Sequence, residues 1–380
     1  MLKKEKLKLP IENSKPILPN LEIFNKNINY LIKSGIFANN GKFHKSLTKR
    51  LKDYLKVENL VLTSSCTSAI RSILAIHNFD ENKREIIVPS FTFVATISSI
   101  VACGYIPVFV DVKIDDGNID PKEVEKAITK KTFAILGVHS YGNPCSNNKL
   151  EEIAKRHKIK LFYDAAHAFG ILKKNESILN WGDASAVSFH ATKVFNTCEG
   201  GAIISKNISY LKNLSLYINH GMDIEDKKKS ILSIGMNAKL SELNAAFGLA
   251  IIDKVNISIS IRKNIYQKYL ESFSMIYELL KPFLNIYECN HNYAYAPFIV
   301  KNKDKRNELI KFLNSCEIIT KKYFYPLVSD MKPYLKYKPN KILENSLEIS
   351  NRVVCLPIHP SITEEQLEYI IMKVKYFFKY

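Results

Sequence analysis

The sequence predicts an α/β protein built on a mostly parallel sheet that helices cover on both faces. Between about residues 60 and 205, short runs rich in Val, Ile and Phe alternate with stretches of helical periodicity. Such alternation is typical of a parallel sheet, whose ligands bind outside the carboxyl ends of the strands. The predicted strands are Leu60–Thr63, Glu85–Val88, Val108–Val112, Phe133–Val138, Leu161–Tyr163, Ala184–Phe189 and Ala202–Ser205.

Helical patterns separate most of these strands, and a second, smaller domain follows them. The predicted helices of the first part are His44–Val57, Thr67–His77, Val94–Ala102, Pro121–Ile128 and Asn148–His157. An exposed loop is expected at Met222–Ser230, and a long helix without a stop signal runs from Leu240 to about Phe273. The elements predicted beyond it are a strand, Tyr293–Val300, and two helices, Lys305–Asn314 and Glu364–Tyr380. We therefore divide the chain into a large domain with an N-terminal arm, residues 1–253, and a small α+β domain, residues 254–380.

Composition argues against several classes of protein. With 46% hydrophobic and 24% charged residues, the chain of 380 residues is of ordinary globular type. No apolar run of transmembrane length and no signal-peptide core are found, so we expect a cytoplasmic protein that binds no membrane. The net charge of +18 raises nucleic acid as a partner, but the lysines are dispersed and we expect none. The seven cysteines lack metal-ligand spacing, which predicts reduced thiols and no metal site.

The stretch Ser188–Ile204, SFHATKVFNTCEGGAII, places a lysine between two predicted strands. Burial disfavours the ammonium form, so the amine of Lys193 becomes available as a nucleophile toward carbonyl groups. A loop lysine that reaches out to water is the competing interpretation.

Asp164 ends an earlier strand, in the run FYDAAHA, and a carboxylate that follows two aromatic residues needs a positive partner. An aspartate and a lysine at the carboxyl ends of strands suit pyridoxal phosphate. The aspartate would keep the pyridine nitrogen protonated, and Lys193 would bond to the aldehyde carbon. A structural ion pair would look the same in the sequence.

A phosphate site is the third requirement of this cofactor. Residues 63–69, TSSCTSA, follow a strand and open a helix, which offers backbone N–H groups, hydroxyls and the positive end of the helix dipole. An ordinary helix cap is the alternative. Phe93 follows the next strand and could stack on a flat cofactor ring, although a core phenylalanine is the usual explanation.

Seven motifs in one order resemble the DegT/DnrJ/EryC1/StrS family of sugar aminotransferases. Between about Asn39 and Leu367 they read PSFTFVAT, FVDV…GNIDP, VHSYGNPC, YDAAHA, SFHATKVFNTCEGGAI, INHG and GMNAKLSELNAAFGLA. The resemblance implies the type I fold of PLP-dependent transferases, as in aspartate aminotransferase, with a seven-stranded, mostly parallel sheet and a small C-terminal domain. It also implies a homodimer with shared active sites that moves an amino group from L-glutamate to a nucleotide-linked keto sugar.

The resemblance implies roles for individual residues. Lys193 would be the Schiff-base lysine and proton shuttle, and Asp164 would pair with the pyridine nitrogen of pyridoxal 5'-phosphate. The other residues implied at the cofactor are Cys66, Thr67 and Ser188 at the phosphate, Phe93 on the ring, His167 near the 3-hydroxyl, and Asn237 toward the cofactor of the partner subunit. The residues predicted to contact substrate are His190, Tyr323 and His359. The sequence departs from the family pattern at Cys66, where glycine is usual, and at Lys239, where arginine is common.

The loop around the lysine indicates the substrate. Its form, FHATK…EGG, resembles enzymes that aminate C4 of dTDP-linked 4-keto-6-deoxyhexoses, which implies synthesis of a surface glycan or lipopolysaccharide. Basic residues such as Lys321, Lys322 and Arg352 would suit the nucleotide diphosphate. A GDP-4-keto-6-deoxymannose (perosamine-type) enzyme, a C3 or UDP-sugar aminotransferase, and a catalytically silent regulatory member stay open. The presence of Lys193 argues against the branch that deoxygenates C3, where histidine replaces the lysine.

Overall fold

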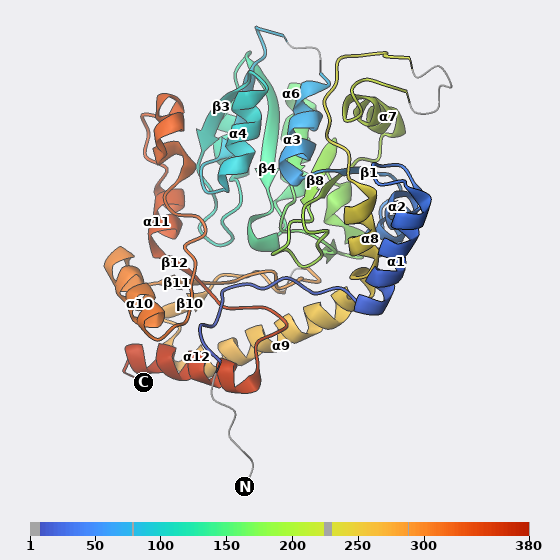
Figure 1. Cartoon of the computed structure of the whole chain (residues 1–380). Coiled ribbons are helices and arrows are strands. Elements are labelled where there is room, and N and C mark those ends of the chain that lie inside the picture. The colour runs from blue at the N-terminus through green and yellow to red at the C-terminus, as the bar shows by residue number, and fades with distance from the viewer. Residues whose placement is uncertain (1–7, 78–79, 224–229, 288, 380) are drawn as a thin grey trace.

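A computed structural model describes residues 8–77, 80–223, 230–287 and 289–379 of the chain. In this part of the chain, seven strands form one sheet in the order β1-β9-β8-β5-β4-β2-β3 (Figure 1). Neighbouring strands pair in parallel, except that β9 runs antiparallel to β1 and β8. The strands are β1 (Leu60–Thr63), β2 (Glu85–Pro89), β3 (Ile106–Val110), β4 (Thr132–Val138), β5 (Lys160–Asp164), β8 (Ala184–Ser188) and β9 (Gly201–Ile204). The predicted seven-stranded, mostly parallel sheet is confirmed.

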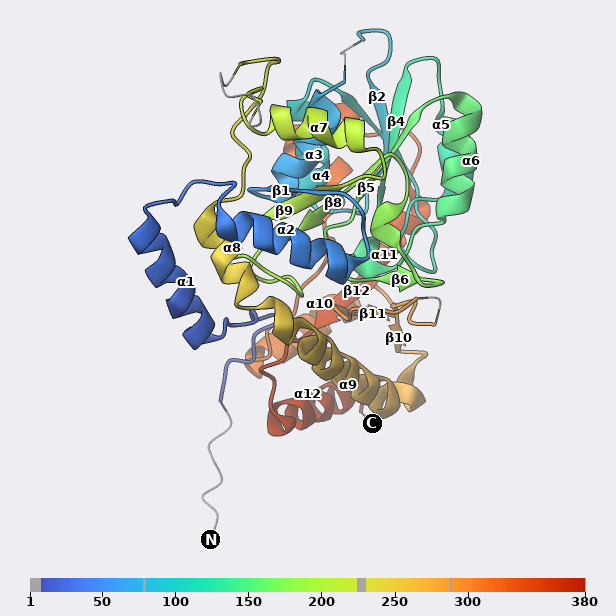
Figure 2. The ribbon, with the colours of Figure 1, turned by 90° about the vertical axis from the view of Figure 1, so that its right-hand side faces the viewer.

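Helices cover both faces of this sheet, as Figures 1 and 2 show together. One face packs on α3 (Cys66–Ala75), α4 (Val94–Ala102) and α7 (Ile208–Tyr217). The other face packs on α2 (Lys42–Leu55), α5 (Pro121–Ala127), α6 (Asn147–His157) and α8 (Glu242–Leu249). Because both faces are covered, the strands are apolar almost throughout: Ile135 and Leu136 of β4 point to opposite cores and both are buried. The outer helix α1 (Leu21–Ser34) packs on α8.

The small domain contains a three-stranded antiparallel sheet that helices cover. Its strands lie in the order β10 (Leu280–Pro282), β11 (Ala296–Val300) and β12 (Val353–Leu356). Its helices are α9 (Val255–Phe273), α10 (Lys303–Ser315), α11 (Glu344–Arg352) and α12 (Glu364–Phe377). A two-stranded ribbon, β6 (Leu172–Lys173) with β7 (Glu176–Ser177), belongs to the large domain.

The N-terminal segment joins the small domain although it belongs to the other end of the chain. Ile11 forms a parallel bridge with Ile318, and the side-chain amide of Asn13 donates to the carbonyl of Cys355 at 2.8 Å. The backbone of Asn13 in turn accepts a hydrogen bond from the amide of Ile358. The domain boundary between residues 253 and 254 stays a prediction. The N-terminal segment precedes this boundary in the sequence, but it packs on the small domain.

The long helix predicted from Leu240 to Phe273 is corrected by the structure. Helix α8 ends at Leu249, a 3-10 turn covers Ile252–Lys254, and α9 begins at Val255. The sequence between α8 and α9 contains no glycine or proline that would announce the break. The break lies where the chain leaves the core of the large domain for that of the small one, so tertiary packing sets it.

The expectation that no apolar run reaches membrane-spanning length is also corrected. Within the described residues, the helical stretch Glu242–Ile276 is long and apolar enough to span a membrane by length and composition alone. Its residues serve the two cores of this fold, and Arg262 in its middle is fully buried among carbonyl groups.

Other elements differ less from their predictions. Strand β3 lies two residues earlier than predicted because Val112 pairs instead with Ile119 in an isolated bridge. Strand β11 begins at Ala296, since the residues before it contact the large domain. Helix α1, which was not among the predicted helices, follows an Asn20 side chain that caps two backbone N–H groups. Most of the predicted loop Met222–Ser230 lies outside the described residues.

Candidate active site

A cavity of about 370 Å³ lies where β4, β5 and β8 end at their carboxyl termini. The first turns of α3 and α4 close one side of it, and residues that precede β11 close the other. Asp164, at the end of β5, and Lys193, in the loop between β8 and β9, both line this cavity. The strand ends thus bring together two residues that the sequence analysis paired, as expected for a parallel sheet.

Asp164 is a buried carboxylic acid, with 6% of its surface exposed. Its oxygens accept hydrogen bonds from the hydroxyl of Thr96 at 2.7 Å and from the amide of Ala166 at 3.1 Å. Burial raises its pKa above the usual value, while these two donors and the nearby charge of Lys193 oppose the shift. In the described part of the chain no cation lies within 4 Å of this carboxylate, so Asp164 is prepared for a positive group that a ligand brings.

Lys193 projects its amine across the cavity toward the small domain. Its Nζ donates a hydrogen bond to the phenol oxygen of Tyr295 at 2.9 Å. A backbone bond from the Lys193 amide to the carbonyl of His190 closes the turn on which the lysine stands. The amine is therefore held by a side chain that lines the same cavity.

His167 lies beside this lysine and is neutral. Its Nδ1 accepts a hydrogen bond from the amide of Tyr141 at 3.1 Å, which assigns the ring proton to Nε2. Burial, with a smaller effect from the charge of Lys193, holds the pKa of His167 well below its ordinary value. Its ring packs between Tyr295, at 4.5 Å, and Phe324, at 5.9 Å between centroids. A neutral imidazole N–H is thus available as a donor at the cavity wall.

The first turn of α3 lines one end of the cavity. Ser65 is the N-cap, and its hydroxyl accepts from the Ser68 amide in a capping box. Cys66 and Thr67 stand in the first turn and line the cavity together with Ser188. Because Cys66 has ordinary helical geometry, the absence of the usual glycine introduces no backbone strain. Strand β9 approaches so closely that a Cβ at Gly201 would lie 2.7 Å from the Cys66 nitrogen, which explains the glycine there.

Aromatic and polar side chains surround the mouth of the cavity. Phe93 is the N-cap residue of α4 and is 53% exposed, which is unusual for a phenylalanine that serves only packing. Tyr323 also lines the cavity, and its predicted contact with substrate stays a prediction. His190 lies at the mouth, 3.7 Å from the carboxylate of Glu199 and 3.0 Å from the hydroxyl of Thr192.

Two residues of the predicted site do not line this cavity. Asn237 is exposed and pairs with Asn219 in a bridge, so its predicted contact with a partner subunit's cofactor stays a prediction. His359 is 1% exposed and binds the carbonyl of Glu12 at 3.2 Å, where burial lowers its pKa to about 4. It contributes to the docking of the N-terminal segment.

Two residues that bond to Asp164 and Lys193 were not predicted from the sequence. Thr96, which donates to Asp164, lies within the apolar helix α4. The available signal in the sequence was its spacing of four residues from Thr92, whose hydroxyl it contacts. Tyr295, which binds Lys193, falls inside a run that was predicted as a plain strand. No local pattern marks it, because its partner lies 102 residues away.

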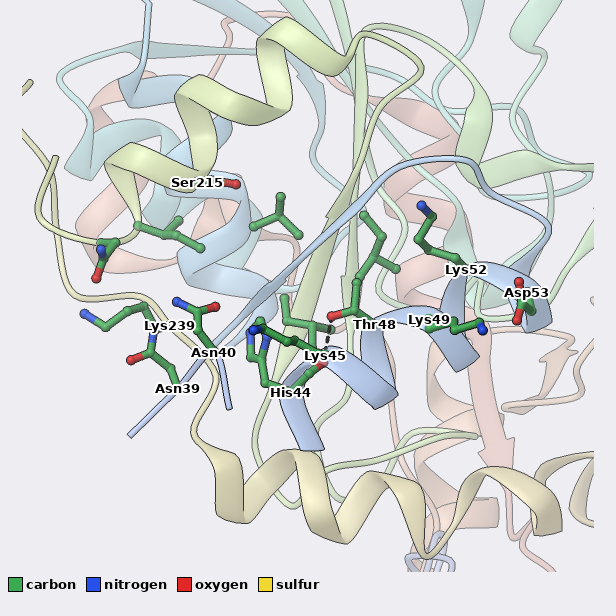
Figure 3. A pocket seen from close by; sticks show the side chains of 15 residues that line it. Asn39, Asn40, His44, Lys45, Thr48, Lys49, Lys52, Asp53, Ser215 and Lys239 are labelled. Carbon is green, nitrogen blue, oxygen red and sulfur yellow. Dashed lines mark hydrogen bonds between the residues drawn. The ribbon is translucent and has the colours of Figure 1, made fainter. Parts of the chain in front are cut away.

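A second and larger hollow, of about 560 Å³, lies beside β1 and is lined by lysines (Figure 3). Lys45, Lys49 and Lys52 come from α2, and Lys239 lies near Asn39 and Asn40 at the other end of the hollow. We call this hollow the lysine groove.

Helix α2, which carries three of these lysines, is held at its start by Glu242. The buried carboxylate of Glu242 accepts hydrogen bonds from the backbone amides of Gly41, Phe43 and His44.

The profile of the DegT/DnrJ/EryC1/StrS aminotransferase family matches residues 21–375. The chain belongs to this family. The prediction of a sugar-nucleotide aminotransferase is thereby confirmed at the level of the enzyme class.

Members of the DegT/DnrJ/EryC1/StrS family match this chain over nearly its whole length. A dTDP-4-amino-4,6-dideoxy-D-glucose transaminase of Shigella dysenteriae is 37% identical over 371 residues, which cover 96% of this chain and 98% of that protein. The protein of the same name from Escherichia coli is 33% identical over 95% of this chain and 96% of its own length. A GDP-perosamine synthase of Vibrio cholerae is 27% identical over 93% of this chain and 95% of its own.

Solved structures confirm the fold. Helicobacter pylori PseC, an aminotransferase involved in the biosynthesis of pseudoaminic acid, superimposes with a TM-score of 0.91 at 25% identity. The match covers 98% of this chain and 100% of that one. DesI, solved in the presence of its TDP-sugar product, matches with a TM-score of 0.90 at 26% identity, over 97% of this chain and 93% of its own.

Proposed function

We propose that the protein is a pyridoxal phosphate-dependent aminotransferase that moves an amino group from L-glutamate to C4 of a dTDP-linked 4-keto-6-deoxyhexose. The observation that carries the proposal is the cavity itself, in which a buried carboxylate without a cation and a lysine amine face one space. The 37% identity to the Shigella dysenteriae transaminase supports the choice of dTDP and of C4.

The residues present fit pyridoxal phosphate. The unpaired, buried carboxylate of Asp164 would accept from a protonated pyridine nitrogen, and the Nε2–H of His167 would donate to the 3-hydroxyl oxygen. The first turn of α3, with Cys66 and Thr67, and the hydroxyl of Ser188 would hold the phosphate. The exposed ring of Phe93 would cover the cofactor. When bound, the cofactor supplies an aldehyde carbon that bonds to amines and a ring that accepts electrons.

Lys193 is the proton carrier of the proposed reaction. With the cofactor bound, the free amine of Lys193 would remove the proton from Cα of glutamate and pass it to the cofactor in the first half-reaction. In the second half-reaction the same amine would carry the proton back and deliver it to C4 of the sugar. Asp164 would act by its charge, because a buried carboxylate would favour the protonated form of the ring nitrogen.

We further propose a cytoplasmic homodimer that serves synthesis of a surface glycan such as lipopolysaccharide. Large apolar side chains are exposed on and beside α1, and a second copy of the chain would cover them. They are Leu18, Leu21, Ile32, Ile36, Phe37 and Leu243. Asn237 is also exposed and would be free to reach a partner's cofactor. Size-exclusion chromatography with light scattering measures the mass of the assembly directly. An active monomer would contradict an active site that two subunits share.

The function is tested by the absorbance spectrum of the purified protein with pyridoxal phosphate. We expect a cofactor band that L-glutamate displaces and that a dTDP-4-keto-6-deoxyhexose restores. Restoration by GDP-4-keto-6-deoxymannose alone would favour a perosamine-type enzyme, and by a 3-keto or UDP-linked sugar alone, those alternatives. A protein that forms no band with added cofactor would be a catalytically silent family member.

A further inference from the structure

The contact between Lys193 and Tyr295 joins the two domains at the reacting amine. Lys193 belongs to the loop between β8 and β9, whereas Tyr295 directly precedes β11 of the small-domain sheet. We propose that Tyr295 is a positioning residue whose phenol holds the amine of Lys193 during the part of the reaction in which the amine is not bonded to the cofactor. The proposal rests on the proposed aminotransferase function and adds a residue to it.

Tyr295 is held in place by its own segment. The side-chain amide of Asn292 donates to the carbonyls of His167 and Phe169, both at 2.9 Å, and its oxygen accepts from the amide of Ala294 at 3.0 Å. Asn292 is 1% exposed, so these bonds form in a dry environment that strengthens them. The segment is thereby fixed to the loop that follows Asp164, and the Tyr295 ring lies against His167.

A released lysine amine needs such a partner for two reasons. Its side chain has four rotatable bonds, and holding it in one conformation costs up to about 2 kcal/mol of rotamer entropy. The nearby carboxylate of Asp164 carries the opposite charge, and an ion pair between it and the amine would occupy the carboxylate that the cofactor requires. In the described part of the chain the amine bonds to Tyr295 and forms no ion pair with Asp164 within 4 Å.

A phenol suits this task better than a carboxylate. A tyrosine hydroxyl both accepts and donates, so it can bond to the ammonium as an acceptor and to the neutral amine as a donor. The contact with Lys193 therefore survives the gain and the loss of a proton, which a proton carrier undergoes in each half-reaction. The other titratable groups near this amine are Cys66, Asp164 and His167.

Trace labelling of the cofactor-free protein with acetic anhydride tests the contact directly. Peptide mass spectrometry gives the acetylation rate of Lys193 relative to the exposed Lys311 in the same sample. We expect Tyr295→Phe, which keeps the ring, to raise this ratio about fivefold, the factor that one hydrogen bond of about 1 kcal/mol represents. Tyr323→Phe is the matched control, since that phenol lines the same cavity while its bond to Tyr141 uses the backbone carbonyl.

An unchanged ratio in Tyr295→Phe would overturn the proposal. If this variant does not fold, Asn292→Ala, which frees the segment, must raise the ratio instead. The acetylation measurement needs neither cofactor nor substrate, so its result is valid even if the proposed activity is wrong.

In the enzyme loaded with cofactor, the half-reaction with L-glutamate should show kcat about tenfold lower in Tyr295→Phe with KM unchanged. A rise in KM alone would assign the phenol to substrate binding and contradict the positioning role.

Discussion

The cavity at the strand ends and the lysine groove contain the same kinds of side chain, yet they differ in chemistry. Each has a lysine, an aspartate, a histidine and a threonine in or directly behind its wall. The groove is larger and carries more positive charge, at about 560 Å³ against about 370 Å³. In the cavity the aspartate is buried and the lysine meets a fixed phenol, whereas Lys49 and Asp53 of the groove are exposed. Burial and fixed partners, and not size or charge, separate a reactive site from a charged surface.

The largest difference in turnover is expected between substitutions of Lys193 in the cavity and of Lys49 in the groove. Lys193→Ala should lower turnover of L-glutamate and keto sugar more than about a thousandfold, because the nucleophile and proton carrier is lost. Lys49→Ala in the groove should leave turnover within about twofold. Coupled assay of 2-oxoglutarate release measures both, and a Lys193→Ala enzyme with normal turnover would refute the assignment of the site.

Substitutions of Asp164 in the cavity and of Asp53 in the groove should differ less in their effect on kcat. Asp164→Asn is expected to reduce kcat about a hundredfold, since a neutral amide cannot keep the ring nitrogen cationic. In the cofactor-free protein the same change should stabilise the fold at pH 7. The raised pKa of Asp164 means that its contribution to stability is present at low pH and is lost as the pH rises through that pKa.

Urea unfolding at pH 7 and at pH 4 measures this effect on the free energy of unfolding, and the gain should be smaller at pH 4. Asp53→Asn is the control in the groove and should change neither kcat nor the dependence of stability on pH. An Asp164→Asn protein that loses stability without cofactor would show that this carboxylate has a structural partner after all.

The threonines sharpen the comparison further. Thr96→Val removes the hydroxyl that donates to Asp164 and should lower kcat about tenfold. That donor lowers the pKa of Asp164, so its loss raises the pKa and moves the acidic limb of the pH–rate profile to higher pH. Thr48→Val in the groove, where the hydroxyl donates to the His44 carbonyl, should not move that limb. A shift in both variants would point to a general loss of stability.

The histidines should show the smallest effect. His190 lies exposed at the mouth of the cavity, and His190→Gln is expected to raise KM for the sugar nucleotide about threefold with kcat unchanged. His44→Gln in the groove is the control and should alter neither constant. A hundredfold fall in kcat for His190→Gln would instead assign this imidazole to proton transfer.

Local pattern and strand order explain what could be predicted from the sequence. Strand β1 and helix α4 match their predicted bounds because short apolar runs and helical spacing mark them directly. Asp164 and Lys193 meet because parallel strands end at one edge of a sheet. Tyr295 and the break before α9 could not be predicted, because both depend on how the small domain packs on the large one.

The pairing of the N-terminal segment with β12 has a consequence for how the chain is made. Asn13 and the Cys355 carbonyl that it binds are 342 positions apart, so the segment leaves the ribosome long before its partner strand exists. The segment can cover the core of the small domain only once synthesis is nearly finished, because Ile11 is buried in that core and bridges Ile318. A fragment cut at the predicted domain boundary would lack this cover and would expose apolar surface. We therefore expect residues 254–380, expressed alone, to aggregate, and co-expression with a peptide of residues 8–20 to restore some of their solubility.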